Sequence, residues 1–280
     1  MGNENSININ WYPGHMAKAK RQMEEELKLV DIIIEIRDAR MPLASGNPLL
    51  MELGKNKEHL VILNKADKAD ENENKKWLTY FDNVLLCDSL NENISVKVVN
   101  KVKEILHEKL EKAKARGIRN KVLRAMVVGI PNVGKSTFIN NIVKKKVAKA
   151  ENRPGVTKNL QWIRINNEVE LLDTPGVLWP KLEDQNQAKI LALLGSINDQ
   201  ILDSEDLCNF GLNYIKENYP GLLNNRYGIN ENDDDLILSI GKSKLWLTGD
   251  GMVDKTKTYE MVLKDIRSSK IGRITYESIK

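Results

Sequence analysis

The stretch GIPNVGKST, residues 129–137, limits the folds open to this 280-residue chain more than any other feature. It matches the pattern G-x-x-x-x-G-K-[ST], with Gly129, Gly134, Lys135 and Ser136 at the defined positions. The apolar run RAMVV precedes it and a helical pattern follows, which is the strand, loop and helix that this motif requires. In such a loop the backbone N–H groups cradle phosphate oxygens, the lysine reaches the β and γ phosphates, and the serine hydroxyl binds Mg²⁺. The chain is therefore predicted to bind a nucleotide on an α/β sheet.

A second motif, LLDTPG, places Asp173 at the end of an apolar strand, with Gly176 three positions later. The pattern D-x-x-G is weak evidence by itself, but it is specific when it follows a phosphate loop. The Asp173 carboxylate is expected to hold the Mg²⁺ shell, through water, and the Gly176 N–H is expected to meet a γ-phosphate. Ser136 and Asp173 are thus two predicted Mg²⁺ residues.

The tetrapeptide NKAD, residues 64–67, indicates which base is bound. The Asp67 carboxylate offers two acceptors, and guanine presents a matching pair of donors, its ring N–H and its amino group. Adenine has no such pair, so the carboxylate would remain unpaired against it, which is a strong basis for discrimination. Asn64 and the stem of Lys65 are expected to fix the loop and to pack on the base.

Strand patterns alternate with helical ones over the first part of the chain, which favours an α/β sheet. Helices are expected at residues 14–29 and 95–116, and strands at VDIIIEIRDAR, HLVILNKAD, NVLLCDS, RAMVV, LQWIRIN and EVELLDTPG. Their β-branched runs are typical of a mostly parallel sheet with helices on both faces. No strand is expected in residues 185–280, where the periodicity is helical. Two domains are therefore predicted, residues 1–180 and residues 181–280.

Charge is spread unevenly along the chain, whose formal net charge is +4. Residues 97–149 hold fifteen lysines and arginines against three acids, a balance that favours contact with a polyanion. The C-terminal helix offers Lys257, Lys264 and Arg267 on one face for phosphate contact. In both segments the alternative is an ordinary solvated helix face. No apolar run is long enough to span a membrane and the first residues lack a signal-peptide core, so we expect a cytoplasmic protein.

The order of the motifs is unusual, because the base loop at residue 64 precedes the phosphate loop at residue 129. This is a circularly permuted order. The segments WYPGHMAKAKR, RDAR, IPNVGKSTFIN, RPGVTKNLQW and LLDTPGVLWPK resemble the ribosome biogenesis GTPase A family over nearly the whole chain. The resemblance implies a circularly permuted GTPase domain, a smaller helical domain that contacts ribosomal RNA, and GTP hydrolysis that ribosomal particles stimulate. It implies the large ribosomal subunit precursor, with its RNA and proteins, as the partner, and neither a membrane nor DNA.

A second base loop is predicted at Asp88 and Ser89, directly after the strand VLLC. Leu90 follows where such loops more often have alanine, so the N–H of either Asp88 or Leu90 could meet the guanine oxygen. Together the loops are expected to supply these nucleotide-binding residues: Asn64, Lys65, Ala66, Asp67, Asp88, Ser89, Asn132, Val133, Gly134, Lys135, Ser136, Thr137 and Gly176.

The residues for hydrolysis depart from the commonest pattern. Many GTPases place a glutamine just after D-x-x-G to orient the attacking water, but Val177 stands there in this chain. The family's candidate is His15, in PGHMAK, whose alternative role is at a helix N-terminus or in RNA contact. Arg40, in RDAR, is a rival charge donor, unless it simply pairs with Asp38. The expected catalytic residues are His15, Lys135 and Thr157.

Two further residues are expected to hold cations. GTPases that have an asparagine at the position of Asn132, and lack the downstream glutamine, often resemble potassium-dependent enzymes in which the carboxamide oxygen binds K⁺ beside the phosphates. The alternative is an asparagine that caps its own loop. Thr157, in RPGVTK, matches the switch threonine whose hydroxyl completes the Mg²⁺ shell. The expected substrate is GTP, with Mg²⁺ at Ser136, Thr157 and Asp173 and with K⁺ at Asn132.

The favoured function is a GTPase switch on the assembling large subunit, whose GTP state controls binding and release. The alternative is a ribosome-binding sensor of GTP or (p)ppGpp with incidental hydrolysis, and NKAD disfavours an ATPase. The segment DTPGVLWP, residues 173–180, leaves the sheet and leads into the helical domain. We expect loss of the γ-phosphate to move this tether and to reorient the RNA-binding face.

Overall fold

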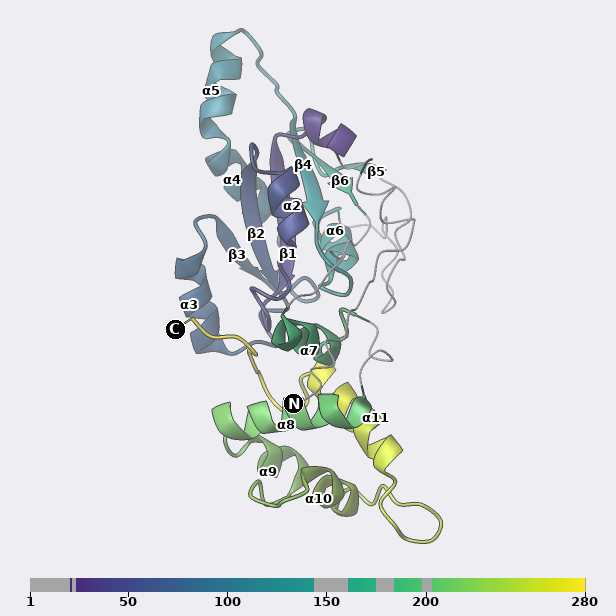
Figure 1. The fold of residues 1–280 in the computed structure, drawn as a ribbon. Coiled ribbons are helices and arrows are strands. Elements are labelled where there is room, and N and C mark those ends of the chain that lie inside the picture. The colour runs from purple at the N-terminus through teal and green to yellow at the C-terminus, as the bar shows by residue number, and fades with distance from the viewer. Residues whose placement is uncertain (1–20, 22–23, 144–160, 175–183, 198–202, 280) are drawn as a thin grey trace, which may run out of the picture.

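A six-stranded sheet lies at the centre of the computed structural model, which describes residues 21, 24–143, 161–174, 184–197 and 203–279 (Figure 1). The strand order is β3-β2-β1-β4-β6-β5. The strands are β1 (Ile32–Asp38), β2 (Glu58–Asn64), β3 (Val84–Cys87), β4 (Leu123–Val128), β5 (Gln161–Arg164) and β6 (Val169–Asp173). Neighbouring strands are parallel except for β5, which is antiparallel to β6. The predicted fold class, α/β with a mostly parallel sheet, is confirmed.

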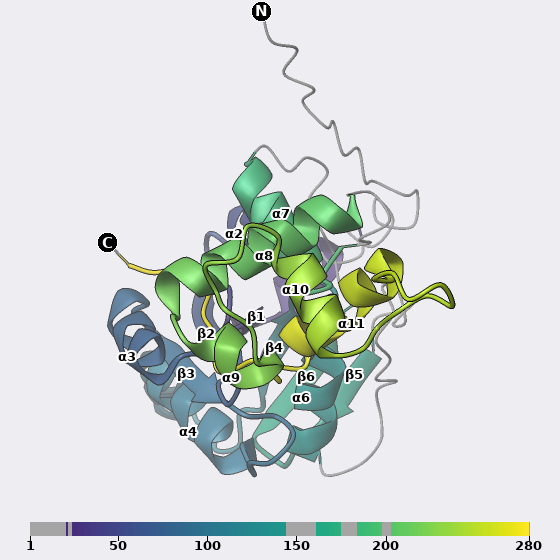
Figure 2. The same ribbon diagram turned by 90° about the horizontal axis from the view of Figure 1, so that it is seen from below.

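Helices cover both faces of this sheet, because successive residues of a buried strand point to opposite sides. Ile32, Ile34 and Ile36 of β1 belong to the same core cluster as residues of α4 and α6, whereas Ile33 packs with Leu50 of α2. Figure 2 shows α2 across the sheet from α4 and α6. The helices of this part are η1 (Leu27–Leu29, a 3₁₀ turn), α2 (Pro48–Leu53), α3 (Glu71–Tyr80), α4 (Ser95–Ile105), α5 (His107–Ala115) and α6 (Lys135–Val143).

Two predicted helices differ from the structure in detail. The helix expected at residues 95–116 is two helices, α4 and α5. The chain leaves helical geometry at Leu106, whose φ of −94° and ψ of 17° accompany a buried side chain. Of the helix expected at residues 14–29, mainly the end is described, and its last turn is the 3₁₀ helix η1.

The carboxyl ends of the parallel strands meet at one edge of the sheet, and the sequence motifs lie there. β2 ends at Asn64, β4 ends at Val128 and β6 ends at Asp173. The order of connection reverses between β1 and β4, which are neighbours in the sheet. Open α/β sheets bind ligands outside the carboxyl ends of the strands at such a switch point.

In the second part of the chain the described residues form five helices, on the side of this edge (Figure 1). They are α7 (Gln185–Leu193), α8 (Ser204–Asn218), α9 (Leu222–Tyr227), α10 (Leu236–Ser243) and α11 (Lys255–Arg267). The described residues beyond 184 contain no strand, only one isolated bridge between Leu247 and Val253, so the helical character is confirmed. The boundary predicted at residue 180 lies outside the described residues. No helix in the described parts of the chain is long and apolar enough to cross a membrane.

The described chain ends in an extended segment, residues 271–279, named here the C-terminal strap. It runs from the end of α11 back to α3 at the sheet (Figures 1 and 2). Along it, the Ile274 N–H donates to the Lys68 carbonyl at 3.1 Å and the Tyr276 N–H donates to the Arg40 carbonyl at 2.7 Å. The strap therefore ties the helical part of the chain to loops at the carboxyl edge of the sheet.

Candidate functional site

The phosphate loop between β4 and α6 has a shape that depends on its glycines. Asn132 and Gly134 both have left-handed backbones, with φ of 64° and 94°. A Cβ on Gly134 would lie 2.3 Å from Nδ2 of Asn64, and a Cβ on Gly129 would lie 2.7 Å from the carbonyl oxygen of Ile36. Glycine at both positions therefore lets the loop approach β1 and the NKAD loop closely.

Lys135 and Asp173 form a buried ion pair where the phosphate loop meets the end of β6. Lys135 Nζ contacts Asp173 Oδ1, and the two side chains are only 6% and 4% exposed. Burial lowers the pKa of Lys135, and the charge of Asp173 acts in the opposite direction. Thr174 Oγ1 donates to the Val127 carbonyl at 2.8 Å, which holds the end of β6 against β4. A buried ammonium beside a carboxylate fits the charges of a phosphate and of its Mg²⁺ ion.

Ser136 and Thr137 stand in the first turn of α6, and both are half-buried. The first N–H groups of a helix have no partner within the helix, so this turn is suited to an anion. The described residues contain no group of three or more His, Cys, Asp or Glu side chains that could hold a metal ion by itself. A Mg²⁺ ion at Ser136 and Asp173 would therefore also need phosphate and water oxygens, as is usual for this ion.

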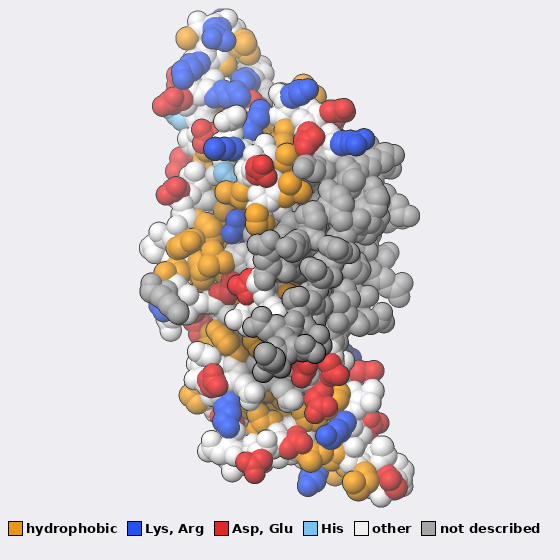
Figure 3. Space-filling model, in the orientation of Figure 1, with side chains coloured by type: hydrophobic (Ala, Val, Ile, Leu, Met, Phe, Trp, Pro, Cys, Tyr) orange, Lys and Arg blue, Asp and Glu red, His pale blue; other side chains and the backbone are white. Residues whose placement is uncertain are grey.

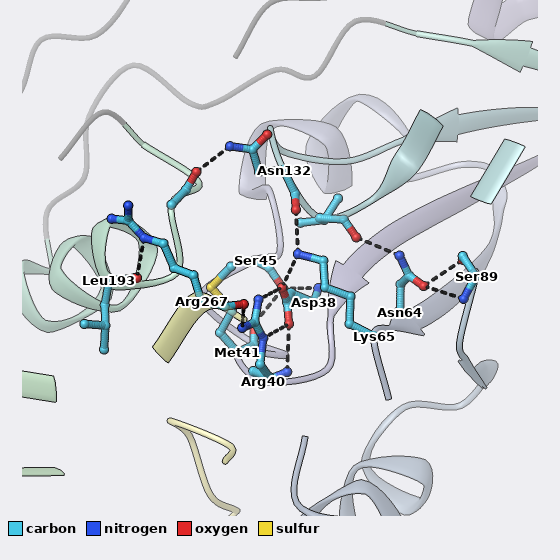
Figure 4. A network of polar contacts seen from close by, with 12 residues as sticks. Asp38, Arg40, Met41, Ser45, Asn64, Lys65, Ser89, Asn132, Leu193 and Arg267 are labelled. Atoms are coloured by element: carbon cyan, nitrogen blue, oxygen red, sulfur yellow. Dashed lines mark hydrogen bonds and ion pairs between the residues drawn. The ribbon is translucent and has the colours of Figure 1, made fainter. Parts of the chain in front are cut away.

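Asn64 joins the three nucleotide loops (Figure 4). Its Nδ2 donates to the Val133 carbonyl in the phosphate loop at 2.8 Å. Its Oδ1 accepts from Ser89 in the second base loop, at 2.7 Å from the hydroxyl and at 3.2 Å from the N–H. The amide of Asn64 is thus used within the protein, where it sets the spacing between the loops.

Lys65 is held by a buried carboxylate that sequence reasoning did not connect to it (Figure 4). Its Nζ donates to the Asn132 carbonyl at 2.6 Å and to Asp38 Oδ2 at 2.7 Å. Arg40 Nη2 donates to the same carboxylate at 2.8 Å, so the pairing with Asp38, the alternative considered for Arg40, is present in the structure. Burial acts to raise the pKa of Asp38, but Arg40 and Lys65 outweigh it and hold the pKa below its usual range. The sequence feature that could have pointed to this contact is the acid Asp38 at the end of a buried strand.

Asp67 is exposed at the edge of this network, which leaves its carboxylate open to a base. The neighbouring Ala66 N–H donates to the Cys87 carbonyl at 3.1 Å. In the second base loop the Leu90 N–H donates to Asp88 Oδ1 at 3.0 Å. Since Leu90 is engaged in this way, the N–H of Asp88 is the better candidate for the guanine oxygen.

Asn132 links the phosphate loop to the helical part (Figure 4). Its Nδ2 donates to the Gly195 carbonyl, just beyond α7, at 2.5 Å. The sequence offered no sign of this contact, because the two residues lie far apart along the chain. Four residues singled out from the sequence, His15, Thr157, Gly176 and Val177, lie outside the described residues and have no place in this geometry.

Comparisons with known proteins extend this picture. A family described as "50S ribosome-binding GTPase" matches residues 124–245. The ribosome biogenesis GTPase A of Bacillus cereus is 46% identical over 277 residues, which cover 96% of this chain and 94% of that protein. The chain belongs to the ribosome biogenesis GTPase A family. The family's Thermotoga maritima protein is 29% identical, over 96% of this chain and 94% of its own length.

The solved structures agree with this membership. The crystal structure titled GNP-bound YlqF from T. maritima has a TM-score of 0.67 at 26% identity, and the match covers 93% of this chain and 98% of that one. The GDP-bound structure of the same protein has a TM-score of 0.65 at 25% identity, with 92% and 99% covered. The resemblance to the ribosome biogenesis GTPase A family and the circularly permuted GTPase fold, both predicted from the sequence, are confirmed. Membership of this GTPase family supports GTP binding and hydrolysis, typically with Mg²⁺.

Proposed function

We propose that this protein is a GTP-hydrolysing assembly factor that binds the maturing large ribosomal subunit, and that its GTP state controls binding and release. The observation that carries the proposal is the hydrogen bond from Asn132, in the phosphate loop, to Gly195 in the helical part. A second bond joins Arg40 Nη1 to the Arg267 carbonyl at the end of α11, at 3.0 Å. A shift of the nucleotide loops would therefore reach the helical part through direct contacts, in addition to the proposed tether.

Each residue of the proposed site has a distinct task. Asp67 recognises guanine, and the first turn of α6 receives the β and γ phosphates. Lys135 neutralises charge on these phosphates, for which its ammonium must turn from Asp173 toward the nucleotide. Ser136, Thr157 and, through water, Asp173 hold Mg²⁺, which supplies further neutralisation of the phosphate charge when it is bound.

The K⁺ assignment and the water-orienting assignment belong to the same proposal. Because Asn132 Nδ2 is committed to the Gly195 carbonyl, the carboxamide oxygen is the atom left to bind K⁺. His15 remains our candidate for orienting the attacking water, and Gly176 remains the candidate for sensing the γ-phosphate.

We assign contact with ribosomal RNA to the helical domain, residues 181–280, and to the basic segment 97–149. Much of the charge in that segment is balanced by acids, through ion pairs of Lys101, Lys103, Lys109, Lys112, Lys114, Lys121, Arg124 and Lys135. Figure 3 shows basic and acidic side chains interspersed over the end of the molecule where α5 lies. In the described part of this segment, residues 97–143, basic side chains are therefore interspersed with acids and do not form a uniform basic surface.

In α11 the predicted basic face is smaller than expected. Arg267 donates from Nε to the Leu193 carbonyl at 3.0 Å and from Nη2 to the Ala192 carbonyl at 2.9 Å, so its guanidinium packs within the helical part. Lys257 and Lys264 are exposed and remain the candidates for phosphate contact. Because the proposed partner is an assembling ribosomal subunit, we also propose a cytoplasmic location.

Affinity for large-subunit particles is expected to depend on the nucleotide. With a non-hydrolysable GTP analogue, the protein should bind precursor large subunits at least about tenfold more tightly than with GDP, which corresponds to a modest coupling energy. Co-sedimentation with particles in each nucleotide state measures this, and small-subunit particles serve as the control. Equal affinity in the two states would contradict control by GTP.

A further inference from the structure

The C-terminal strap contacts the NKAD loop directly, on both sides of Asp67. Arg273 Nε donates to the Ala69 carbonyl at 2.8 Å, and Arg273 Nη2 donates to the Ala66 carbonyl at 3.2 Å. Between these two bonds, the Ile274 N–H donates to the Lys68 carbonyl at 3.1 Å. The strap therefore binds the three carbonyl groups that flank the base-recognising residue.

The strap itself is firmly seated from the side of the helical part. The hydroxyls of Tyr214 and Tyr219, both on or next to α8, donate to the Thr275 carbonyl at 2.8 and 3.1 Å. The Thr275 hydroxyl in turn accepts from the Asp70 N–H at 3.0 Å. Ile274 is buried in the main core cluster. Thr275, directly after the two residues that contact the NKAD loop, is thus fixed in place.

A second anchor lies at the far end of the strap. The Glu277 carboxylate accepts from the N–H groups of Leu43 and Ala44 at 2.7 and 2.8 Å. Burial raises the pKa of the Glu277 carboxyl to about 7, although the two hydrogen bonds act in the opposite direction. Farther along, Ile279 packs against the cluster that contains Trp77 of α3. The backbone that follows Arg273 is therefore held at Thr275, Glu277 and Ile279.

We propose that Arg273 is a positioning residue for base recognition, and that the C-terminal strap holds Asp67 in the geometry that selects guanine. Asp67 is exposed, so the direction of its carboxylate depends on the backbone of residues 66–69, which Arg273 spans. An Arg guanidinium suits this task because its fixed fork can donate to two carbonyls at once. The ion pair of Arg273 with Glu71, at 3.8 Å and exposed, adds little. The inference rests on the proposed role of residues 64–67 as the guanine loop.

The test compares GDP with IDP, which carries hypoxanthine and lacks the amino group that Asp67 is expected to bind. Arg273→Ala should weaken GDP binding about tenfold, since it removes two charge-assisted hydrogen bonds, while IDP binding changes much less. Arg273→Lys keeps the charge without the fork and should fall between Arg273→Ala and the wild type. Lys270→Ala, an equal loss of charge at an exposed position three residues earlier, should leave both affinities unchanged.

The outcomes separate a positioning role from a structural one. A drop in the GDP-to-IDP affinity ratio in Arg273→Ala, with an unchanged thermal unfolding temperature, supports the proposal. An unchanged GDP-to-IDP affinity ratio, whether both affinities fall equally or neither falls, would overturn the proposal while leaving the assignment of the guanine site intact. A wild-type protein that binds GDP and IDP equally would instead overturn the assignment of the guanine loop, and the proposal with it.

Discussion

Replacing Lys135 with alanine is expected to abolish GTP hydrolysis and to destabilise the nucleotide-free protein. Hydrolysis should fall by at least about 10²-fold, because a preorganised cation that neutralises developing charge is lost. The free energy of unfolding should fall by about 3–5 kcal/mol, since breaking a buried ion pair leaves one charge unpaired. Here that charge is Asp173, whose side chain is only 4% exposed.

A double variant distinguishes the two effects of Lys135. In Lys135→Ala/Asp173→Asn the unpaired charge is gone, so most of the lost stability should return while hydrolysis stays absent. Urea unfolding of both variants and of the wild type, without nucleotide, measures the first effect, and phosphate release from GTP measures the second. If Lys135→Ala were as stable as the wild type, the ion pair would contribute nothing to the folded protein. Normal hydrolysis by this variant would remove Lys135 from the site.

Replacing Asp67 with asparagine is expected to change the preferred base from guanine to xanthine. Guanine presents two donors to the carboxylate, whereas xanthine has a carbonyl oxygen in place of the amino group and can accept from the asparagine amide. A site built around such hydrogen bonds rejects the mismatched base by about 10⁴-fold, so the affinity for GDP should fall by orders of magnitude. Because Asp67 is exposed, the change should leave the fold intact.

The matched control for this change is Asp88→Asn in the second base loop. The Asp88 carboxylate accepts from the N–H groups of Leu90 and Asn91 within its own loop, so the substitution should weaken nucleotide binding without changing the preferred base. Binding of GDP and XDP to each variant is the measurement. A preference for GDP retained by Asp67→Asn would show that another residue reads the base.

Much of the sheet and of the nucleotide loops could be predicted from the sequence, because residues close together along the chain determine them. Strands β1, β2 and β4 each contain three or four consecutive apolar residues, and each motif follows a strand directly, so parallel pairing alone brings Asn64 and Asp173 to one edge. The short helices α2 and α9, of six residues each, carry too little periodicity to be recognised. The break at Leu106 depends on tertiary packing and interrupts a pattern that otherwise reads as one helix.

The contacts that join the two parts of the chain were not predictable. Arg273 and Ala66 are separated by 207 positions, and Arg40 and Arg267 by 227. The backbone carbonyl of any residue can accept a hydrogen bond, so the identity of the accepting residue does not reveal the contact. For the same reason nothing in the sequence distinguished Arg267, which packs internally, from the exposed Lys264 on the same helix.

The most direct test of the central claim is the rate of GTP hydrolysis with and without precursor large-subunit particles. In K⁺, particles should raise the turnover of the wild type by at least about tenfold, as expected when a partner completes the catalytic arrangement. The stimulation should be lost in Na⁺ and in His15→Ala. Slow turnover that neither particles, cation nor this substitution changes would contradict the account, and would instead favour a guanine-nucleotide sensor in which hydrolysis is incidental.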